Sequence, residues 1–382
     1  MCKTNQHEEL DARKSKAQAF LEYLTQKYPW ETRKYIAKSE STPVEVLELL
    51  AKDEQSVVRR EVAKNKNVTS VLLFMLAHDL DSSVRAEVAL NEKATLEMLK
   101  ILARDVEDGV RAKVVSNPNI SMELFEELSK DTSQTVLASV AESKMATAEI
   151  LSDIAKLNDE LLNEKVAENP NTSPETLDEL ARSEDLVLLV AIAGNKNTKT
   201  ETLSKLLNTD DEEIGYIVAR HDNCTAELYA KMQKSINEDV RYSVAGYCDN
   251  AEILKMLALD KCAAIRAKVA ENKNTSAETL ANLSRDKTNQ VREAVARNSN
   301  ASYGTLLKLA RDKIPVVRAG VAGNKNASMK MLLRLAEDKY TSVRLEVAGN
   351  YSTPKFILEK LSKDEMFIVS REARETLKNI EN

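Results

Sequence analysis

The six-residue pattern Val-Arg-x-x-Val-Ala returns at a steady step along most of the chain. It occupies residues 58–63, 84–89 and 343–348, with Ile in the first place at 265–270. The closing alanine column recurs every 26 residues, apart from one step of 25. Its members are Ala63, Ala89, Val115, Ala141, Ala167, Ala193, Ala219, Ala245, Ala270, Ala296, Ala322 and Ala348. Self-similarity at this period is typical of a repeat protein.

Each repeat is predicted to hold two helical segments. In residues 69–78 the apolar side chains of Leu72, Leu73 and Leu76 share one stripe of an α-helix, and Thr69 stands at the N-cap position. The second segment carries the Val-Arg pattern over about eight residues, which leaves both α and 3₁₀ geometry open. An Asn-x-Asn pair such as Asn65/Asn67 closes the repeat and favours a helix end.

One such repeat cannot bury its apolar stripe alone, so neighbouring repeats must stack into a continuous core. Gly (8) and Pro (7) are scarce in 382 residues, which also favours helix over sheet. We therefore expect an all-α, right-handed α-solenoid of about thirteen units without strands. Residues 37–354 form the array, and residues 355–382 form a C-terminal helical cap. Residues 1–36, with Phe20, Leu21, Leu24, Tyr28 and Trp30, form an N-terminal helical cap.

The repeat reads approximately V-R-x-x-V-A-x-N-x-N-x-[ST]-x-x-x-L-x-x-L-A-x-D, as residues 265–286 show. Over roughly residues 37–350 it resembles the leucine-rich repeat variant family and, more distantly, HEAT repeats. The resemblance implies a right-handed superhelix of alternating α and 3₁₀ helices, and it implies no particular function. The family's founding member carries an N-terminal iron–sulfur segment, but only Cys2 lies in that region here. No cofactor is carried over.

Aspartate and arginine columns run through the array at a spacing of six residues. The pairs are Asp53–Arg59, Asp79–Arg85, Asp105–Arg111, Asp260–Arg266, Asp286–Arg292, Asp312–Arg318 and Asp338–Arg344. We interpret them as a structural ladder in which each guanidinium pairs with a neighbouring repeat's carboxylate and nearby carbonyls. The alternative is a basic stripe for phosphate, which the matching number of aspartates disfavours.

The ladder fails in the middle of the array, between about residues 137 and 247. The arginine column there reads Leu137, Asn163, Leu189 and Gly215, and the aspartate column reads Leu157, Ser183, Thr209 and Ser235. Tyr216, Tyr229, Tyr242 and Tyr247 lie close by, with His221. Because tyrosine is favoured at protein interfaces, these five residues are the candidate binding residues for a partner or a second copy. Drift in degenerate repeats, or a local change of curvature, is the alternative.

No catalytic residue and no metal ligand is assigned. The chain has three histidines, none at motif spacing from a nucleophile or a carboxylate, and no nucleotide-binding, zinc-protease or hydrolase motif. His221, Cys224, Cys248 and Cys262 include zinc-competent side chains, but no C-x₂-C pair occurs. The N-terminus lacks a secretory signal and no apolar stretch is long enough for a membrane span. Scattered cysteines then favour a reduced, cytoplasmic protein.

The sequence therefore predicts a non-enzymatic scaffold that offers an extended curved surface to an unidentified protein partner. The alternative is a HEAT-like nucleic-acid-binding protein that uses lysines beside the turns: Lys64, Lys66, Lys144, Lys196, Lys273 and Lys325. A net charge of −6 argues against general binding of polyanions. Neither the partner nor the oligomeric state follows from these residues.

Overall fold

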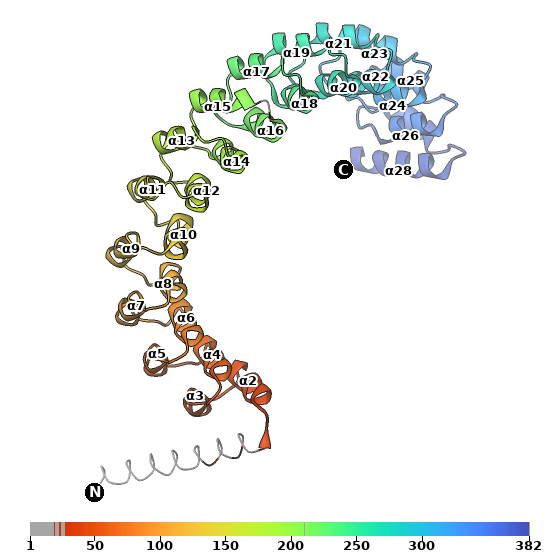
Figure 1. The fold of residues 1–382 in the computed structure, drawn as a ribbon. Helices are drawn as coiled ribbons and strands as arrows, with labels where there is room; N and C mark the ends of the chain where they lie inside the picture. The colour runs from red at the N-terminus through yellow and green to blue at the C-terminus, as the bar shows by residue number, and fades with distance from the viewer. Residues whose placement is uncertain (1–18, 20–22, 24–26, 210, 382) are drawn as a thin grey trace. The chain divides into compact units, whose positions relative to one another are not determined.

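The structure is a computed structural model and describes residues 19, 23, 27–209 and 211–381. Phe20, Leu21 and Leu24 of the expected N-terminal cap lie outside the described residues. The chain divides into two compact units, unit 1 (Met1–Asn197) and unit 2 (Thr198–Asn382). Each unit repeats one motif, a first helix followed by a second helix (Figure 1).

The first helices are short, at seven or eight residues. In unit 1 they are α3 (Val44–Leu50), α5 (Ser70–Leu76), α7 (Leu96–Leu102), α9 (Met122–Leu128), α11 (Ala148–Ala155) and α13 (Pro174–Leu180). In unit 2 they are α15 (Thr200–Leu206), α17 (Ala226–Met232), α19 (Ala251–Leu257), α21 (Ala277–Leu283), α23 (Tyr303–Leu309), α25 (Met329–Leu335) and α27 (Lys355–Leu361).

The second helices carry the Val-Arg pattern. In unit 1 they are α2 (Trp30–Lys38), α4 (Ser56–Lys64), α6 (Ser82–Leu90), α8 (Asp108–Val115), α10 (Gln134–Glu142), α12 (Glu160–Glu168) and α14 (Leu186–Gly194). In unit 2 they are α16 (Glu212–Arg220), α18 (Glu238–Tyr247), α20 (Ala263–Glu271), α22 (Asn289–Arg297), α24 (Pro315–Ala322), α26 (Thr341–Gly349) and the longer α28 (Phe367–Glu381).

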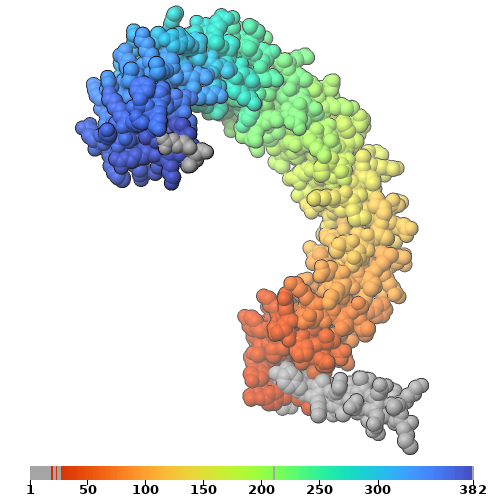
Figure 2. All heavy atoms as spheres, turned by 180° about the vertical axis from the view of Figure 1, so that it is seen from behind, coloured from red at the N-terminus to blue at the C-terminus, as the bar shows by residue number. Residues whose placement is uncertain are grey.

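Within each unit the second helices form one layer and the first helices form the other (Figure 1). Consecutive second helices pack closely along the layer, whereas the first helices mainly touch the second helices beside them. In the space-filling view, each repeat within a unit borders the repeats next to it in the sequence (Figure 2). The prediction of an all-α solenoid is therefore confirmed, and no strand occurs among the residues that the structure describes.

The alanine column lies where the repeats meet. Ala63, Ala89 and Ala296 are fully buried, and Val115, at 3 % exposure, is the most exposed of the twelve. An alanine there lets consecutive second helices approach closely, while the Leu72, Leu73 and Leu76 positions fill the space under the first helices. The expected burial of this column is confirmed.

The second segment of each repeat is α-helical, which differs from the alternating α and 3₁₀ pattern that the family resemblance implies. The second helices run for at least eight residues, and the one 3₁₀ helix in the described residues is η1 (Leu207–Thr209). The physical reason lies in the Val-Arg-x-x-Val-Ala pattern. Val58, Val62 and Ala63 are buried on one α-helical face at spacings of four and five residues, which a three-residue turn would spread around the helix.

The ladder residues bond across the repeat boundary. Arg59 Nε lies 2.7 Å from Asp79 Oδ2, and its Nη2 donates to the other carboxylate oxygen at 2.8 Å. Its Nη1 donates to the backbone carbonyl of Asp53 at 2.6 Å. The six-residue spacing in the sequence therefore corresponds to a carbonyl contact, and the ion pair joins residues twenty apart.

Nine such ladder pairs occur in the described residues, with Nε–Oδ2 distances of 2.6–2.7 Å. They are Arg33–Asp53, Arg59–Asp79, Arg85–Asp105 and Arg111–Asp131 in unit 1, and Arg241–Asp260, Arg266–Asp286, Arg292–Asp312, Arg318–Asp338 and Arg344–Asp364 in unit 2. Arg33, Arg241, Asp131 and Asp364 are not among the ladder residues predicted from the sequence. The hydrogen bond from Arg111 lowers the pKa of Asp131, as expected for a bidentate pair.

The asparagine column makes a second set of contacts between repeats. Asn298 Nδ2 donates to the carbonyls of Ala270 and Asn272 in the preceding repeat, at 2.7 and 3.0 Å. Its Oδ1 accepts from the backbone N–H of Asn300 at 2.8 Å and so closes the local turn. One side chain therefore supplies donors to the end of the preceding second helix, whose last carbonyls have no partner within that helix. We call this arrangement the asparagine clamp.

Candidate interaction site

Five side chains from three consecutive second helices of unit 2 gather on the second-helix layer. Helix α16 provides Tyr216 and Arg220, α18 provides Tyr242 and Tyr247, and α20 provides Lys268. We call this group the aromatic–cationic cluster. Tyr216, Tyr242 and Tyr247 are each between 41 and 45 % exposed, so the rings are available to a partner.

Arg220 stands at the centre of one half of the cluster. Its guanidinium carbon lies 5.2 Å from the centroid of the Tyr216 ring and 5.3 Å from that of Tyr247. The two rings meet edge to face, with centroids 6.3 Å apart and an interplanar angle of 78°. Arg220 Nη1 also donates to Tyr216 Oη at 2.5 Å. Two aromatic contacts and one hydrogen bond thus restrain the guanidinium.

The hydroxyls of the two tyrosines are linked as well. The hydrogen bond from Tyr247, together with Arg220, lowers the pKa of Tyr216. The same interaction with Tyr216 raises the pKa of Tyr247. The two phenol groups therefore act on each other, and Arg220 acts on Tyr216.

Lys268 forms the other half of the cluster. Its Nζ lies 5.5 Å from the centroid of the Tyr242 ring and 3.1 Å from Glu271 Oε2. Its aliphatic stem crosses Gly246, where an added Cβ would stand 3.2 Å from Lys268 Cε. A glycine at the end of α18 therefore gives the lysine room to lie across the helix and reach the tyrosine.

The end of α18 lacks an asparagine clamp. The helix extends to Tyr247, so Cys248 stands at the C-cap where other repeats have asparagine, and its thiol has no amide donors. An asparagine there would donate to the carbonyl of Ala219 in the preceding repeat. The hydroxyl of Tyr229, from α17, takes this role and donates to Ala219 O at 2.8 Å and to Tyr247 O at 3.3 Å. Tyr229 is only 7 % exposed, and burial raises its pKa. Of the predicted binding residues, Tyr229 thus lies beneath the surface that the other tyrosines form.

His221 also stands in the asparagine column and closes its turn in the same way as an asparagine. Its Nδ1 accepts from the backbone N–H of Asn223 at 3.0 Å, the role that Oδ1 plays elsewhere. The next repeat is one residue short, and Cys248 Sγ accepts from Asn250 N at 3.4 Å. Helix α18 is ten residues long, and only three residues separate it from α19. His221 is half-buried.

The predicted site residues thus separate into two groups. Tyr216, Tyr242 and Tyr247 come together at the surface, whereas Tyr229 and His221 serve the fold around them. Arg220 and Lys268 belong to the cluster but are not among the binding residues predicted from the sequence. A signal for Arg220 was present in the sequence, because it lies four residues after Tyr216 and therefore on the same helix face.

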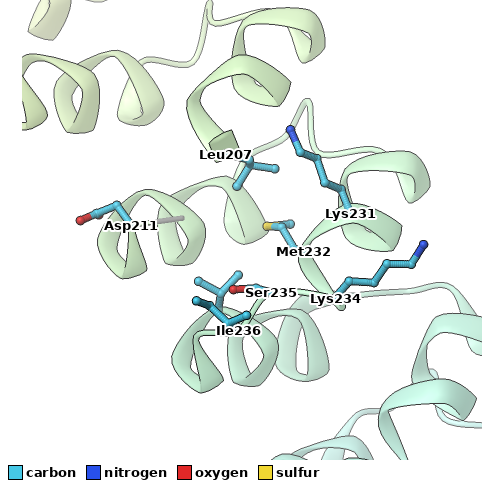
Figure 3. A pocket seen from close by; sticks show the side chains of 8 residues that line it. Leu207, Asp211, Lys231, Met232, Lys234, Ser235 and Ile236 are labelled. Carbon is cyan, nitrogen blue, oxygen red and sulfur yellow. The ribbon is translucent and has the colours of Figure 1, made fainter. Parts of the chain in front are cut away.

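We call the stretch without ladder pairs, between about residues 137 and 247, the ladder gap. A shallow pocket of about 280 Å³ lies beside its last missing pair, Gly215 and Ser235 (Figure 3). It is lined by Leu207, Asp211, Lys231, Met232, Lys234, Ser235, Ile236 and Val240. Its polar groups already serve the fold. Lys231 Nζ donates to Ser204 O and Asn208 Oδ1, and Asp211 accepts from the first N–H groups of α16. Gly215 replaces the ladder arginine there, since an added Cβ would stand 2.5 Å from Val240 Cγ2.

The cysteines offer no metal centre in the described part of the chain, where no group of three or more His, Cys, Asp or Glu side chains is placed to bind an ion. Cys224, Cys248 and Cys262 are free thiols. Burial raises the pKa of Cys224 and of Cys248 to about 11, so both stay protonated at neutral pH. A thiol of this kind is neither a ready metal ligand nor a nucleophile.

Two of the six turn lysines pair with carboxylates. Lys64 Nζ lies 3.0 Å from Glu87 Oε1, and Lys66 Nζ lies 2.8 Å from Glu40 Oε1. These pairs reduce the positive potential that the lysines would offer to phosphates. Nowhere in the described residues does a helix combine the length and the apolarity that a bilayer crossing requires.

Comparison with known proteins gives distant likenesses of fold. No protein-family model and no curated protein matches the sequence. Among solved structures, a leucine-rich repeat variant shares 21 % identity over 58 % of this chain and 88 % of its own, with a TM-score of 0.44. Kap121p bound to RanGTP shares 13 % identity over 91 % of this chain and 46 % of its own, with a TM-score of 0.38. The chain thus spans about half the length of Kap121p. The fold of this chain follows from its own helices and their packing.

Proposed function

We propose that this chain is a non-enzymatic docking protein that binds a protein partner on the second-helix layer of α16, α18 and α20. The aromatic–cationic cluster is the anchor of that surface. The observation that carries the proposal is a group of three half-exposed tyrosines, two of them around a restrained arginine and the third against a lysine. Tyrosine and arginine are the residue types, with tryptophan, that most often dominate binding energy at interfaces.

The cluster is ordered before any partner arrives, which supports this role. Arg220 is held between two rings, and Tyr229 supports the backbone carbonyl of Tyr247 from below. Fixing side chains on binding costs about 0.5–1.5 kcal/mol each, so a surface that is already ordered loses less entropy. A layer of stacked helices further allows weaker contacts to be distributed around the anchor.

We also propose a cytoplasmic location and the absence of catalysis. The free thiols of Cys224, Cys248 and Cys262 suit a reducing compartment. The high thiol pKa of Cys224 and of Cys248 leaves both without nucleophilic character at neutral pH.

The test compares two double variants of the full chain as bait in quantitative affinity purification. Tyr242→Ala with Tyr247→Ala removes two rings of the cluster. Tyr303→Ala with Tyr351→Ala removes two exposed tyrosines elsewhere in unit 2 and is the matched control. We expect the cluster variant to lose at least about tenfold in recovery of its main partner, while the control retains it. Complexes that all survive the cluster variant would remove the proposal.

The nucleic-acid alternative is tested separately by a mobility-shift titration with DNA and RNA at low salt. Binding through backbone phosphates would weaken steeply as salt is added, because counterions are released. Absence of any shift at low salt excludes this alternative. A strong, salt-sensitive shift that depends on Lys273 and Lys325 would instead replace the protein-docking proposal.

A further inference from the structure

We propose that Arg220 receives a carboxylate of the partner, so that the segment docked on the aromatic–cationic cluster contains an Asp or Glu side chain. The inference rests on the proposed docking function and specifies the chemistry of its partner. It starts from a difference between Arg220 and the ladder arginines in how their guanidinium groups are occupied.

Each ladder arginine uses its guanidinium fully within the fold. In Arg292, Nε and Nη2 grip the carboxylate of Asp312, and Nη1 donates to two backbone carbonyls. Arg220 uses only Nη1, in its bond to Tyr216 Oη. Among the described residues no carboxylate forms an ion pair with Arg220. Its remaining N–H groups stand on an exposed side chain, in the fork geometry that suits a carboxylate.

The rings of Tyr216 and Tyr247 lie 5.2 and 5.3 Å from this guanidinium carbon and restrain it. The edge of the guanidinium carries five N–H donors, and the bond from Nη1 uses one of them, so the others can meet a ligand in the plane. Carboxylate and phosphate both match this geometry. The surrounding charges decide between a single carboxylate and a phosphate backbone.

Acidic side chains lie at the opposite ends of the same helices. Along α16, Glu212, Tyr216 and Arg220 follow one another at four-residue spacing and share one face. Glu238 precedes Tyr242 on α18 in the same way, and both glutamates are exposed. A nucleic-acid strand that crossed this face would bring its phosphates against Glu212 and Glu238. A peptide with one carboxylate at Arg220 and with uncharged or basic residues beside Glu212 and Glu238 avoids this repulsion and still pairs with the arginine.

Tyr242 and Tyr247 supply the apolar part of the same surface. Tyr247 lies beside Arg220, and Tyr242 adds a second exposed ring on the same helix, against Lys268. A residue next to the partner's carboxylate can therefore rest on an aromatic ring. We therefore expect the docked segment to place an aliphatic or aromatic residue beside its Asp or Glu.

The experiment is a selection of peptides from a random phage-displayed library on the immobilised full chain. Counter-selection uses the Tyr242→Ala, Tyr247→Ala variant, so that peptides dependent on the cluster are retained. We expect these peptides to be enriched in Asp or Glu next to an apolar residue. Arg220→Gln should weaken them about tenfold, and Arg285→Gln, an exposed arginine on the first-helix side, should leave them unchanged.

A double-mutant cycle tests whether Arg220 contacts the peptide's carboxylate directly. Replacing the peptide's Glu by Gln should weaken binding to the unmodified chain about tenfold, and should have little further effect on Arg220→Gln. Arg220→Glu should instead select peptides with Lys or Arg at that place. Cluster-dependent peptides without an acidic residue, or peptides insensitive to Arg220→Gln, would overturn the inference while leaving the docking function intact. A phosphoserine peptide that binds well above its Glu counterpart would also overturn it.

A library that yields no peptide dependent on the tyrosines would remove the docking function itself, and the inference with it. The two failures are thus distinguishable. Circular dichroism and the unfolding midpoint of Arg220→Gln provide the folding control, since an exposed side chain at a helix end should change neither.

Discussion

Neighbouring repeats that carry the ladder are held together by different polar contacts from those in the ladder gap. In a laddered repeat, Asp312 accepts from Ile314 N at the start of α24 and grips Arg292 of the preceding repeat. At the corresponding positions in the gap, Ser183 and Thr209 accept from the backbone N–H of Asp185 and of Asp211, two residues later, and have no carboxylate for an ion pair. The local turn is kept and the long-range pair is lost.

In the ladder gap, the arginine and the aspartate of each pair are replaced together. This explains why the fold keeps its stability there. Each missing arginine has lost its aspartate twenty residues later, as in Leu137 with Leu157 and Asn163 with Ser183. A lone arginine or aspartate at these half-buried positions would be an unpaired charge, which is more costly than no charge. The paired loss frees the gap repeats to carry other side chains on their surface, and the tyrosines of the aromatic–cationic cluster lie at its end.

Breaking a ladder pair should have the largest effect on stability. Asp312→Ala leaves the Arg292 guanidinium without its carboxylate in a site where both side chains are about nine-tenths buried. We expect a loss of about 3 kcal/mol in the free energy of unfolding. Ser183→Ala, at the corresponding position in the gap, should cost less than about 1 kcal/mol. Urea unfolding of both variants measures the difference, and equal losses would contradict the role given to the ladder.

Removing an asparagine clamp should have the next largest effect. Asn298→Ala leaves the carbonyls of Ala270 and Asn272 without their donor, at an expected cost of about 2 kcal/mol. Ser143, in the same column, closes its turn through one bond to Met145 N. Ser143→Ala should therefore cost less than about 1 kcal/mol. The same unfolding measurement checks this, and a larger loss at Ser143 would reverse our assignment of the column.

Loss of the hydroxyl from a buried tyrosine and from an exposed tyrosine should change the free energy of unfolding by smaller amounts. Tyr229→Phe keeps the packing and removes the hydroxyl that bonds to Ala219 O, so we expect a loss of about 1 kcal/mol. Tyr216→Phe, on the exposed side, should leave the unfolding free energy within about 0.5 kcal/mol of the original. If Tyr216→Phe were the more destabilising change, the division into supporting and surface tyrosines would be wrong.

The smallest change is the pH dependence of a single ladder pair. Arg111 lowers the pKa of Asp131 below its value of about 3.9 in an unfolded chain. The stabilisation from this carboxylate is therefore complete above about pH 4 and disappears as the pH falls through the folded-state pKa. Unfolding free energies of the original chain and of Asp131→Asn should converge below about pH 4. A difference that grows toward acid pH would contradict the assignment.

The sequence was sufficient to predict the repeat, its buried alanine column and the solenoid class, because these depend on periodicity alone. It could not decide between α and 3₁₀ geometry in the second segment, since a short apolar pattern fits both until packing is known. The partner of each ladder arginine lies nineteen or twenty residues away, and only the stacking of repeats reveals it. Arg33 and Asp364 extend the ladder beyond the range that the sequence pattern suggested.

The candidate site was predictable in part for a related reason. The sequence predicts that the tyrosines near the ladder gap lie at the surface, and Tyr216, Tyr242 and Tyr247 do lie there. Tyr229 is buried instead, because it stands in the first-helix leucine column and donates to the Ala219 carbonyl in place of an asparagine at the end of α18. Two columns that break in the same repeat are a sequence signal for such compensation, but its meaning depends on knowing which carbonyl each column serves.

Hydrogen exchange on the full chain, measured with and without its captured partner, tests the central claim most directly. Docking on the aromatic–cationic cluster predicts slower amide exchange in α16, α18 and α20, with the laddered second helices α4 and α6 unchanged. Protection confined to the first helices, or to α4 and α6, would show that the partner binds elsewhere and would contradict the account.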